Sequence, residues 1–202
     1  APDQNWSGMG HVKTIGHPLR VRDVELADGT IAYTSDGAPS DCVALALLGY
    51  FDQEFDLVVS GINPMPNVGH DVTYSGTVTA AMEAVIKGIP GIAVSLDSEK
   101  NHLELLDYGP AASVAQTIAG QVLVHSLPNG ILLNVNVPYL PSDEIQGYQV
   151  TSQGMRVYND RLDKRVDPRD HPYFWISGSA PSGIPKEGTD IGALNEGHVS
   201  IT

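Results

Sequence analysis

The residues best suited to chemistry lie in one polar loop that follows a short apolar run at residues 57–59. Its polar side chains are Asn63, Asn67, His70, Asp71 and Thr73. Asn63 offers an oxygen at the end of the preceding strand, which suits a hard cation such as Mg²⁺. Asparagine is also a common turn residue. The loop has few apolar residues to anchor it, so we expect it to bind a ligand rather than only to connect two elements.

A helix is expected to begin where this loop ends, with Ser75 as its N-cap and Gly76 and Thr77 in its first turn. Position 78 is Val rather than Glu or Gln, so no capping-box carboxylate occupies the helix terminus. The amides of this turn and the positive end of the helix dipole therefore favour an anion such as phosphate. The alternative is an ordinary N-cap without a ligand.

Several other catalytic motifs are absent from the sequence. There is no H-E-x-x-H zinc motif, no G-x-S-x-G nucleophile elbow, no G-x-G-x-x-G and no P-loop. The single cysteine, Cys42, excludes an internal disulfide and is expected to be a small buried apolar residue. Ser7 precedes a glycine in a polar loop, a setting typical of a turn.

The elements that must position these residues alternate along the chain. Helical patterns cover residues 39–48, 75–87 and 110–125, and the first of them is apolar enough to be well buried. In the second, an apolar stripe is formed by Val78, Ala81, Met82, Val85 and Ile86. Short apolar runs at residues 57–59, 92–94 and 131–137 are typical of buried parallel strands. The order predicts a doubly wound, mostly parallel α/β sheet, with ligands at the carboxyl ends of its strands.

Three further segments lie outside this alternation. Residues 19–33 alternate around Asp28-Gly29, as in a hairpin, and residues 147–151 form a candidate strand. Residues 153–176 are polar and charged and end in an aromatic cluster, so we expect a hairpin or arm that projects from the core. Such a cluster needs cover, so an oligomer contact and a solvated loop are equal alternatives for this segment.

Composition limits the classes of function. The chain has 202 residues, 42% of them hydrophobic, which is typical of one globular domain over residues 1–202. A formal net charge of −13 disfavours binding to a nucleic-acid polymer. No apolar run is long enough to span a membrane, and the first residues do not have the pattern of a signal peptide.

Ordered motifs along nearly the whole chain resemble the SurE survival-protein family. Residues 1–8 resemble its A-P-D-x-x-x-S-G segment, and residues 36–43 its D-G-T-P-x-D-C-V segment. Residues 60–63, Asn67, Gly69 and residues 74–78 resemble its S-G-I-N…N-x-G…Y-S-G-T-V signature. Residues 188–190 and 197–202 resemble its C-terminal region.

The resemblance implies a three-layer, Rossmann-like domain and the activity of a 5′-nucleotidase, a metal-dependent phosphatase acting on nucleoside monophosphates. It implies one Mg²⁺ or Mn²⁺ ion held by two adjacent aspartates, a serine and an asparagine. Ser7 and Asn63 match this serine and asparagine, whereas Asn67 and Ser75 match residues lining the phosphate pocket. Members of the family are cytoplasmic and form homodimers or homotetramers through a projecting hairpin and a C-terminal extension.

The chain departs from the family at several positions. The family begins with a strand that leads into an N-D-D-G motif, and this aspartate pair has no counterpart here. We therefore expect a βαβ start of roughly thirty residues and part of the C-terminal extension to be missing, with the catalytic aspartates placed before Ala1. Pro64-Met65 and His70 replace a glycine and an acidic residue that are common in the family. If the native protein lacks the aspartates, the alternative is a non-catalytic phosphate- or nucleotide-binding module.

Overall fold

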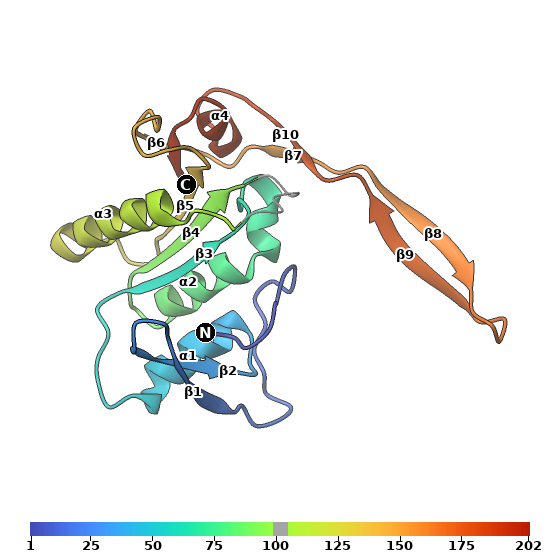
Figure 1. Cartoon of the computed structure of the whole chain (residues 1–202), viewed down its shortest axis with the longest axis horizontal. Coiled ribbons are helices and arrows are strands. Elements are labelled where there is room, and N and C mark those ends of the chain that lie inside the picture. The colour runs from blue at the N-terminus through green and yellow to red at the C-terminus, as the bar shows by residue number, and fades with distance from the viewer. Residues whose placement is uncertain (99–104) are drawn as a thin grey trace.

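The computed structural model describes residues 1–98 and 105–202, and its centre is a five-stranded sheet (Figure 1). Its strands, in spatial order, are β3 (Val58–Asn63), β4 (Gly91–Asp97), β5 (Leu132–Pro138), β11 (Val199–Ile201) and β6 (Tyr148–Val150). The first three run parallel, β11 runs antiparallel to β5, and β6 runs parallel to β11. The predicted mostly parallel α/β sheet is therefore confirmed, with two strands of opposite direction at one edge.

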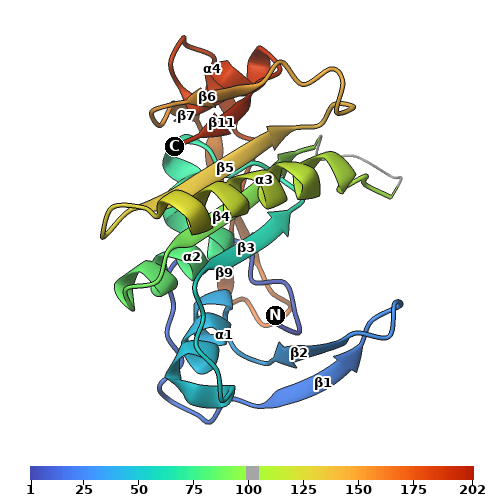
Figure 2. The same ribbon diagram turned by 90° about the vertical axis from the view of Figure 1, so that its left-hand side faces the viewer.

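Helices cover both faces of this sheet, as Figure 2 shows. Helix α2 (Gly76–Ile86) packs on β3 and β4, with α1 (Pro39–Leu45) beside it, and α3 (Gly109–His125) covers the other face. A short irregular helix, η1 (Ala46–Tyr50), follows α1 directly, and α4 (Asp190–Asn195) lies beside β11. The three predicted helices and their alternation with strands are thus confirmed.

The two faces of β4 show why the layers form. Ile92, Val94 and Leu96 are fully buried in one apolar cluster with Val114, Ile118 and Val122 of α3. Burying a large aliphatic side chain contributes about 1.5–3 kcal/mol relative to exposure. The other face is built from small residues: Ala93 packs on Ala81, and a Cβ on Gly91 would lie 2.3 Å from the Ala81 carbonyl oxygen. Helix α2 therefore approaches the sheet closely.

The predicted burial of two helices is partly wrong. In α2 the side chains of Met82 and Ile86 are exposed, whereas Glu83 is buried. The reason is that small residues face the sheet, while Glu83 contacts His11 and Lys13 of an earlier loop. In α1 the fully enclosed residues are Ser40, Asp41 and Ala44, and Cys42 is only half-buried. The apolar side of α1 faces a cleft instead of a packed core.

This cleft, of about 690 Å³, separates β3 from the hairpin formed by β1 (Val21–Glu25) and β2 (Ile31–Ser35). The predicted hairpin over residues 19–33 is confirmed, and its strands pair antiparallel. Pro2 also forms a parallel bridge with Ser35 on β2. Because β3 has no strand partner on the cleft side among the described residues, it is an edge of the central sheet.

The predicted arm is confirmed as a long hairpin that projects from the body of the molecule (Figure 1). Its outer part pairs β8 (Asp160–Val166) with β9 (Pro172–Gly178), and its base pairs β7 (Met155–Val157) with β10 (Ser182–Ile184). The arm thus continues beyond residue 176, to Ile184. Within the described part of the chain, no helix has the length and apolar character needed to cross a membrane.

Candidate functional site

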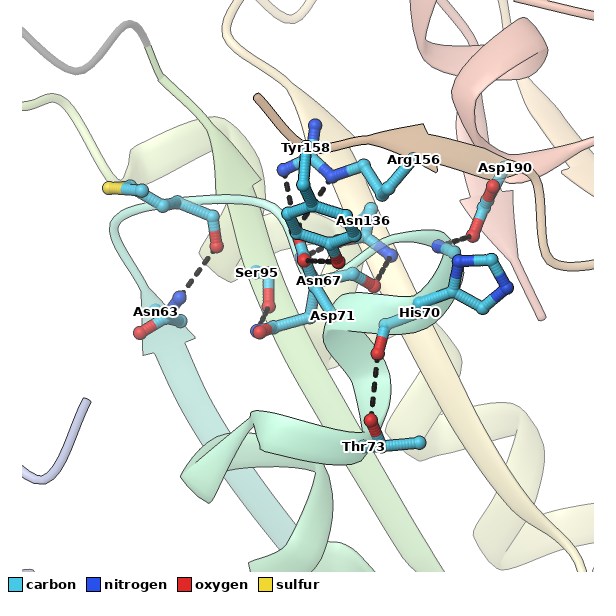
Figure 3. Close-up of polar contacts among 12 residues, drawn as sticks. Asn63, Asn67, His70, Asp71, Thr73, Ser95, Asn136, Arg156, Tyr158 and Asp190 are labelled. Atoms are coloured by element: carbon cyan, nitrogen blue, oxygen red, sulfur yellow. Dashed lines mark hydrogen bonds and ion pairs between the residues drawn. The ribbon is translucent and has the colours of Figure 1, made fainter. Parts of the chain in front are cut away.

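Three polar side chains form a row across the carboxyl-terminal halves of the parallel strands. Strand register pairs Asn63 of β3 with Ser95 of β4, and Ser95 with Asn136 of β5. Asn67 lies over this row, because its side-chain Nδ2 donates to Ser95 Oγ at 2.7 Å and its backbone N–H donates to Asn136 Oδ1 at 2.7 Å (Figure 3). The structure therefore brings the predicted residues Asn63 and Asn67 to the same sheet edge.

Asn67 is held rigidly at this edge. Its carbonyl oxygen accepts hydrogen bonds from Nδ2 of Asn134 at 2.8 Å and from Nδ2 of Asn136 at 3.1 Å, and the residue is 8% exposed. Sequence reasoning missed Ser95, Asn134 and Asn136, which interrupt otherwise apolar strands. A polar side chain within a buried strand costs free energy unless it has a hydrogen-bond partner. A polar residue within an apolar strand sequence is therefore the signal from which these three residues could have been predicted.

Asn63 has one side-chain atom already engaged. Its Nδ2 donates to the carbonyl oxygen of Met65 at 2.6 Å, so Oδ1 is the side-chain atom left to contact a ligand (Figure 3). Asn63 and Thr77 line the same cleft. Thr77 belongs to the first turn of α2, so the cleft connects the end of β3 with the start of that helix.

Ser7 lies in an exposed loop beside the start of α2. The carbonyl oxygen of Trp6 lies near Gly76, and the N–H of Gly10 donates to the Tyr74 carbonyl oxygen at 3.0 Å. Ser7 itself donates its N–H to Asn5 Oδ1 at 2.9 Å, which is the contact of a turn residue. Within the described ranges no hydrogen bond joins Ser7 to Asn63, so their predicted shared role as metal ligands remains a prediction.

Two buried carboxylates tie this loop to the helices below it. Asp41 of α1 accepts from the backbone N–H of Thr14 at 2.9 Å and from its hydroxyl at 2.7 Å. Oε2 of Glu83 on α2 lies 3.0 Å from Nε2 of His11, and Oε1 lies 3.4 Å from Nζ of Lys13. The periodic pattern of the sequence could not indicate these contacts, since each joins a helix to a distant loop.

The N-cap prediction for Ser75 is confirmed. Its Oγ accepts from the backbone N–H of Val78 at 3.1 Å, and the residue is 7% exposed. Gly76 has a packing reason of its own, because a Cβ there would lie 3.0 Å from Cγ of Pro39. The hydroxyl of Ser75 is thus engaged by the helix, and the anion-binding role of Ser75, Gly76 and Thr77 stays a prediction.

A second group of residues fixes the turn η2 (Gly69–Tyr74) that leads to Ser75. Asp71 Oδ2 accepts from Nε of Arg156 at 2.7 Å and lies 2.6 Å from its Nη2 in an ion pair, and Oδ1 accepts from the Tyr158 hydroxyl at 2.6 Å. Fully buried Asp190 accepts from the N–H groups of Gly69 and Gly154, each at 2.7 Å. The sequence placed Asp71 beside His70, but its partners come from the base of the arm.

Two groups near this turn have shifted pKa values. Burial, reinforced by the hydrogen bond to Asp71, raises the pKa of Tyr158 to about 12. Burial also raises the pKa of Asp97 at the end of β4, and the charge of Arg156 partly offsets this. Arg156 therefore acts electrostatically on both the turn and the end of a central strand.

The residues present do not by themselves fit a divalent ion. Over residues 1–98 and 105–202, no three His, Cys, Asp or Glu side chains gather in a geometry that could hold a metal. The candidate ligands Ser7 and Asn63 supply neutral oxygens, whereas sites for Mg²⁺ and similar hard cations rely on carboxylates.

The three layers and the polar row define a Rossmann-like α/β protein with a site at the carboxyl edge of its parallel strands. The model of the family described as "Survival protein SurE" matches residues 1–160. The 5′-nucleotidase SurE of Herpetosiphon aurantiacus is 52% identical over 100% of this chain and 78% of the relative. The same-named protein of Chloroflexus aggregans is 45% identical, with 100% and 79% covered.

A solved structure agrees with these sequence matches. The crystal structure of the SurE protein from Aquifex aeolicus superimposes with a TM-score of 0.78 at 41% identity. The match covers 100% of this chain and 79% of that structure. The chain therefore belongs to the SurE family, as its motifs predicted.

Proposed function

We propose that this protein hydrolyses nucleoside monophosphates to nucleoside and inorganic phosphate, as a 5′-nucleotidase. The observation that carries the proposal is its identity of 52% and 45%, over the whole chain, to two proteins named 5′-nucleotidase SurE. The polar row at the strand ends supports it, since ligands of open α/β sheets bind at this edge.

Asn67 and the first turn of α2 bind the substrate phosphate in this proposal. The amides of Gly76 and Thr77 lie at the positive end of the helix dipole. Asn67 lies nine residues before Gly76 in the sequence and is held by Ser95 at the carboxyl edge of the sheet. A helix terminus typically contributes about 0.3–1 kcal/mol to holding a charge, and up to about 2 when partly buried. Such a contribution is too small to hold a nucleotide alone, so a further charge must take part.

That charge is a divalent ion, Mg²⁺ or Mn²⁺, with Ser7 Oγ and Asn63 Oδ1 as its neutral ligands. Its carboxylate ligands, and with them the general base, are the aspartate pair that the family resemblance expects before Ala1. The cleft beside β3 supports this assignment, because its apolar wall and a strand edge that is unpaired among the described residues fit one further strand between β3 and β2. No numbered residue of this chain receives the role of general base.

The functional unit is a homodimer or homotetramer in the cytoplasm, held together in part by the arm. Large exposed apolar side chains of the arm support self-association: Phe174, Trp175 and Ile176 are 53%, 60% and 81% exposed. The net charge of −13 agrees with a small-molecule substrate rather than a nucleic-acid polymer.

The test uses the product of the complete gene. Inorganic phosphate released from adenosine 5′-monophosphate is measured with Mg²⁺ or Mn²⁺, and again after excess chelator. We expect metal-dependent release that the chelator abolishes. Nucleotide binding without release under either metal would contradict the proposal and favour a non-catalytic binding module.

A further inference from the structure

The base of the arm is bonded directly to the turn that leads into helix α2. Arg156 and Tyr158, at β7 and just after it, together occupy both carboxylate oxygens of Asp71 (Figure 3). Gly69 opens the same turn with a φ of +53°, and a Cβ there would lie 2.6 Å from the Gly154 carbonyl oxygen. Two segments that lie more than eighty residues apart thus pack at van der Waals contact.

This contact is largely enclosed and charged. The side chain of Arg156 is 13% exposed and that of Asp71 is 22% exposed. A guanidinium donates from a rigid planar fork, which fixes the direction of its partner in a way that a lysine ammonium does not. Because the pair is desolvated, loss of one partner leaves an uncompensated charge on the other.

Elsewhere the turn between Asn67 and Ser75 is held near its two ends, where Asp190 accepts from the Gly69 N–H and the Gly10 N–H donates to the Tyr74 carbonyl oxygen. Its internal backbone bonds include a 3.2 Å bond from the Asp71 N–H to the Val68 carbonyl oxygen and a long 3.4 Å bond from Ser75 to Val72. Asp71 lies in the middle of this stretch, four residues from each of Asn67 and Ser75. Because the sheet holds Asn67 itself, the position of the Asp71 carboxylate acts on the path of the turn from that asparagine to the helix start.

We propose that Arg156 is a positioning residue for the phosphate end of the site, and that it acts through Asp71. This rests on the proposed function in taking phosphate as the ligand. Arg156 holds the turn so that Asn67 and the amides of Gly76 and Thr77 face one anion. Tyr158 supports the same carboxylate from its other oxygen. The outer hairpin formed by β8 and β9 is not needed for this role.

The experiment measures binding of inorganic phosphate to the complete protein by calorimetry in the presence of Mn²⁺, alongside the KM and kcat for adenosine 5′-monophosphate. Arg156→Ala should weaken phosphate binding by about tenfold or more, which corresponds to about 1.4 kcal/mol, and should raise KM. Arg156→Lys should recover part of the loss, because charge is kept and only the fork is lost. The matched control, Arg161→Ala, removes an exposed arginine farther along the arm and should bind phosphate like the wild type.

A double variant separates action through Asp71 from an independent effect. Asp71→Asn combined with Arg156→Ala should be no worse than the weaker-binding single variant, because residues that act as one unit are not additive. Replacing residues 160–178 by a short Gly-Ser turn should leave phosphate binding intact. If Arg156→Ala fails to fold, as judged by circular dichroism, Arg156→Lys and Asp71→Asn provide the same comparison.

Each failure has its own signature. Phosphate binding by Arg156→Ala within about twofold of wild type, or fully additive losses in the double variant, would overturn the positioning role. A wild type that binds phosphate but releases none from nucleotides would contradict the nucleotidase and leave this inference standing. A wild type that binds no phosphate would overturn both.

Discussion

At Asn63 a single hydrogen bond decides which atom of the side chain can meet a ligand. The amide nitrogen donates to Met65, so the oxygen is oriented away from that contact and remains for an ion. Loss of an outer-shell partner alone typically costs about 10–100-fold in metal affinity or activity, and Asn63 is proposed as a direct ligand. Asn63→Ala in the complete protein should therefore raise the Mn²⁺ concentration needed for half-maximal activity at least tenfold.

The control for this change is Asn159→Ala, which removes an exposed asparagine on the arm. It should leave the Mn²⁺ dependence as in the wild type. Unfolding of both variants is followed by circular dichroism, so that a loss of fold is not read as a loss of metal. An unchanged Mn²⁺ titration for a folded Asn63→Ala protein would remove this residue from the site.

Asp97 offers a test of stability against pH. Burial raises its pKa in the folded state above the ordinary value of 3.8, so the native state holds the proton more tightly than the unfolded chain. Stability is therefore lost as pH rises from about 3.8 through the folded pKa, and the deficit persists at neutral pH. Asp97→Asn should unfold at a higher temperature than wild type at pH 7, with the difference shrinking as pH falls toward 3.8.

Asp143→Asn, in an exposed loop after β5, is the matched control and should show no such pH-dependent gain. A lower melting temperature for Asp97→Asn at pH 7 would mean that the ionised carboxylate stabilises the fold. In that case its attraction to Arg156 would outweigh the cost of its burial.

Local signals in the sequence reached only part of the site. Asn63, Asn67 and Ser75 could be found because a strand end, a polar loop and a helix start are marked by neighbouring residues. Arg156 belongs to no local pattern and could not be found, and the motif at residues 188–190 did not reveal what Asp190 contacts, since both residues meet the loop across a separation of eighty residues or more. Their partners are fixed by tertiary packing alone.

At the scale of one element, a negative charge at the start of helix α2 would stabilise the helix but oppose the binding of an anion there. Val78 cannot be changed to a carboxylate, because it is 1% exposed and packs on Ala81 and Ala93. Thr77 is half-buried in the same first turn and lines the cleft. A carboxylate at position 77 would stabilise the helix terminus by about 0.3–1 kcal/mol and would repel an anion bound there.

Thr77→Glu should therefore raise the melting temperature or leave it unchanged while weakening inhibition by free phosphate. Ser75→Ala should also weaken phosphate inhibition but should cost about 1 kcal/mol of stability through loss of the cap. Thr117→Glu on the exposed side of α3 adds the same charge elsewhere and serves as the control. Unchanged phosphate inhibition in Thr77→Glu would place the anion away from this helix.

The helices themselves were predictable in extent but not in the faces they bury. Apolar periodicity located α3 and its buried residues Val114, Ile118 and Val122. In α2 the same rule selected Met82 and Ile86, which are exposed, because periodicity counts large residues as buried. Here the close approach to the sheet requires small residues, and a buried glutamate finds its partners in a loop.

At the scale of the whole molecule, the arm contributes surface that its own fold does not cover. Apolar side chains lie on both faces of the β8–β9 hairpin. Leu162 pairs with Ile176 across the strands, so both lie on one face. Trp175 precedes Ile176 on β9, and because successive side chains of a strand alternate, it lies on the opposite face. A two-stranded hairpin is at best marginally stable alone in water. A hairpin as long as β8–β9 therefore favours a partner that covers its apolar surface. A second copy of the chain is the partner we expect.

Replacing residues 160–178 by a short Gly-Ser turn tests this at the right boundary, because it removes the outer hairpin and keeps Arg156 and Tyr158. Sedimentation should show a smaller assembly than the wild type, while Arg156 and Tyr158, which contact Asp71, lie before the replaced residues. A hairpin with Trp175→Ser and Ile176→Ser keeps the backbone and should shift the same equilibrium toward smaller species, because association buries apolar surface at roughly 25 cal/mol per Å². Lys164→Ala, which removes a charge over the Phe174 ring, is the control for a change on the same strand pair. A shortened protein that keeps the wild-type mass per assembly would show that the copies meet through the body of the domain, and the exposed aromatic residues of the arm would then need a different partner.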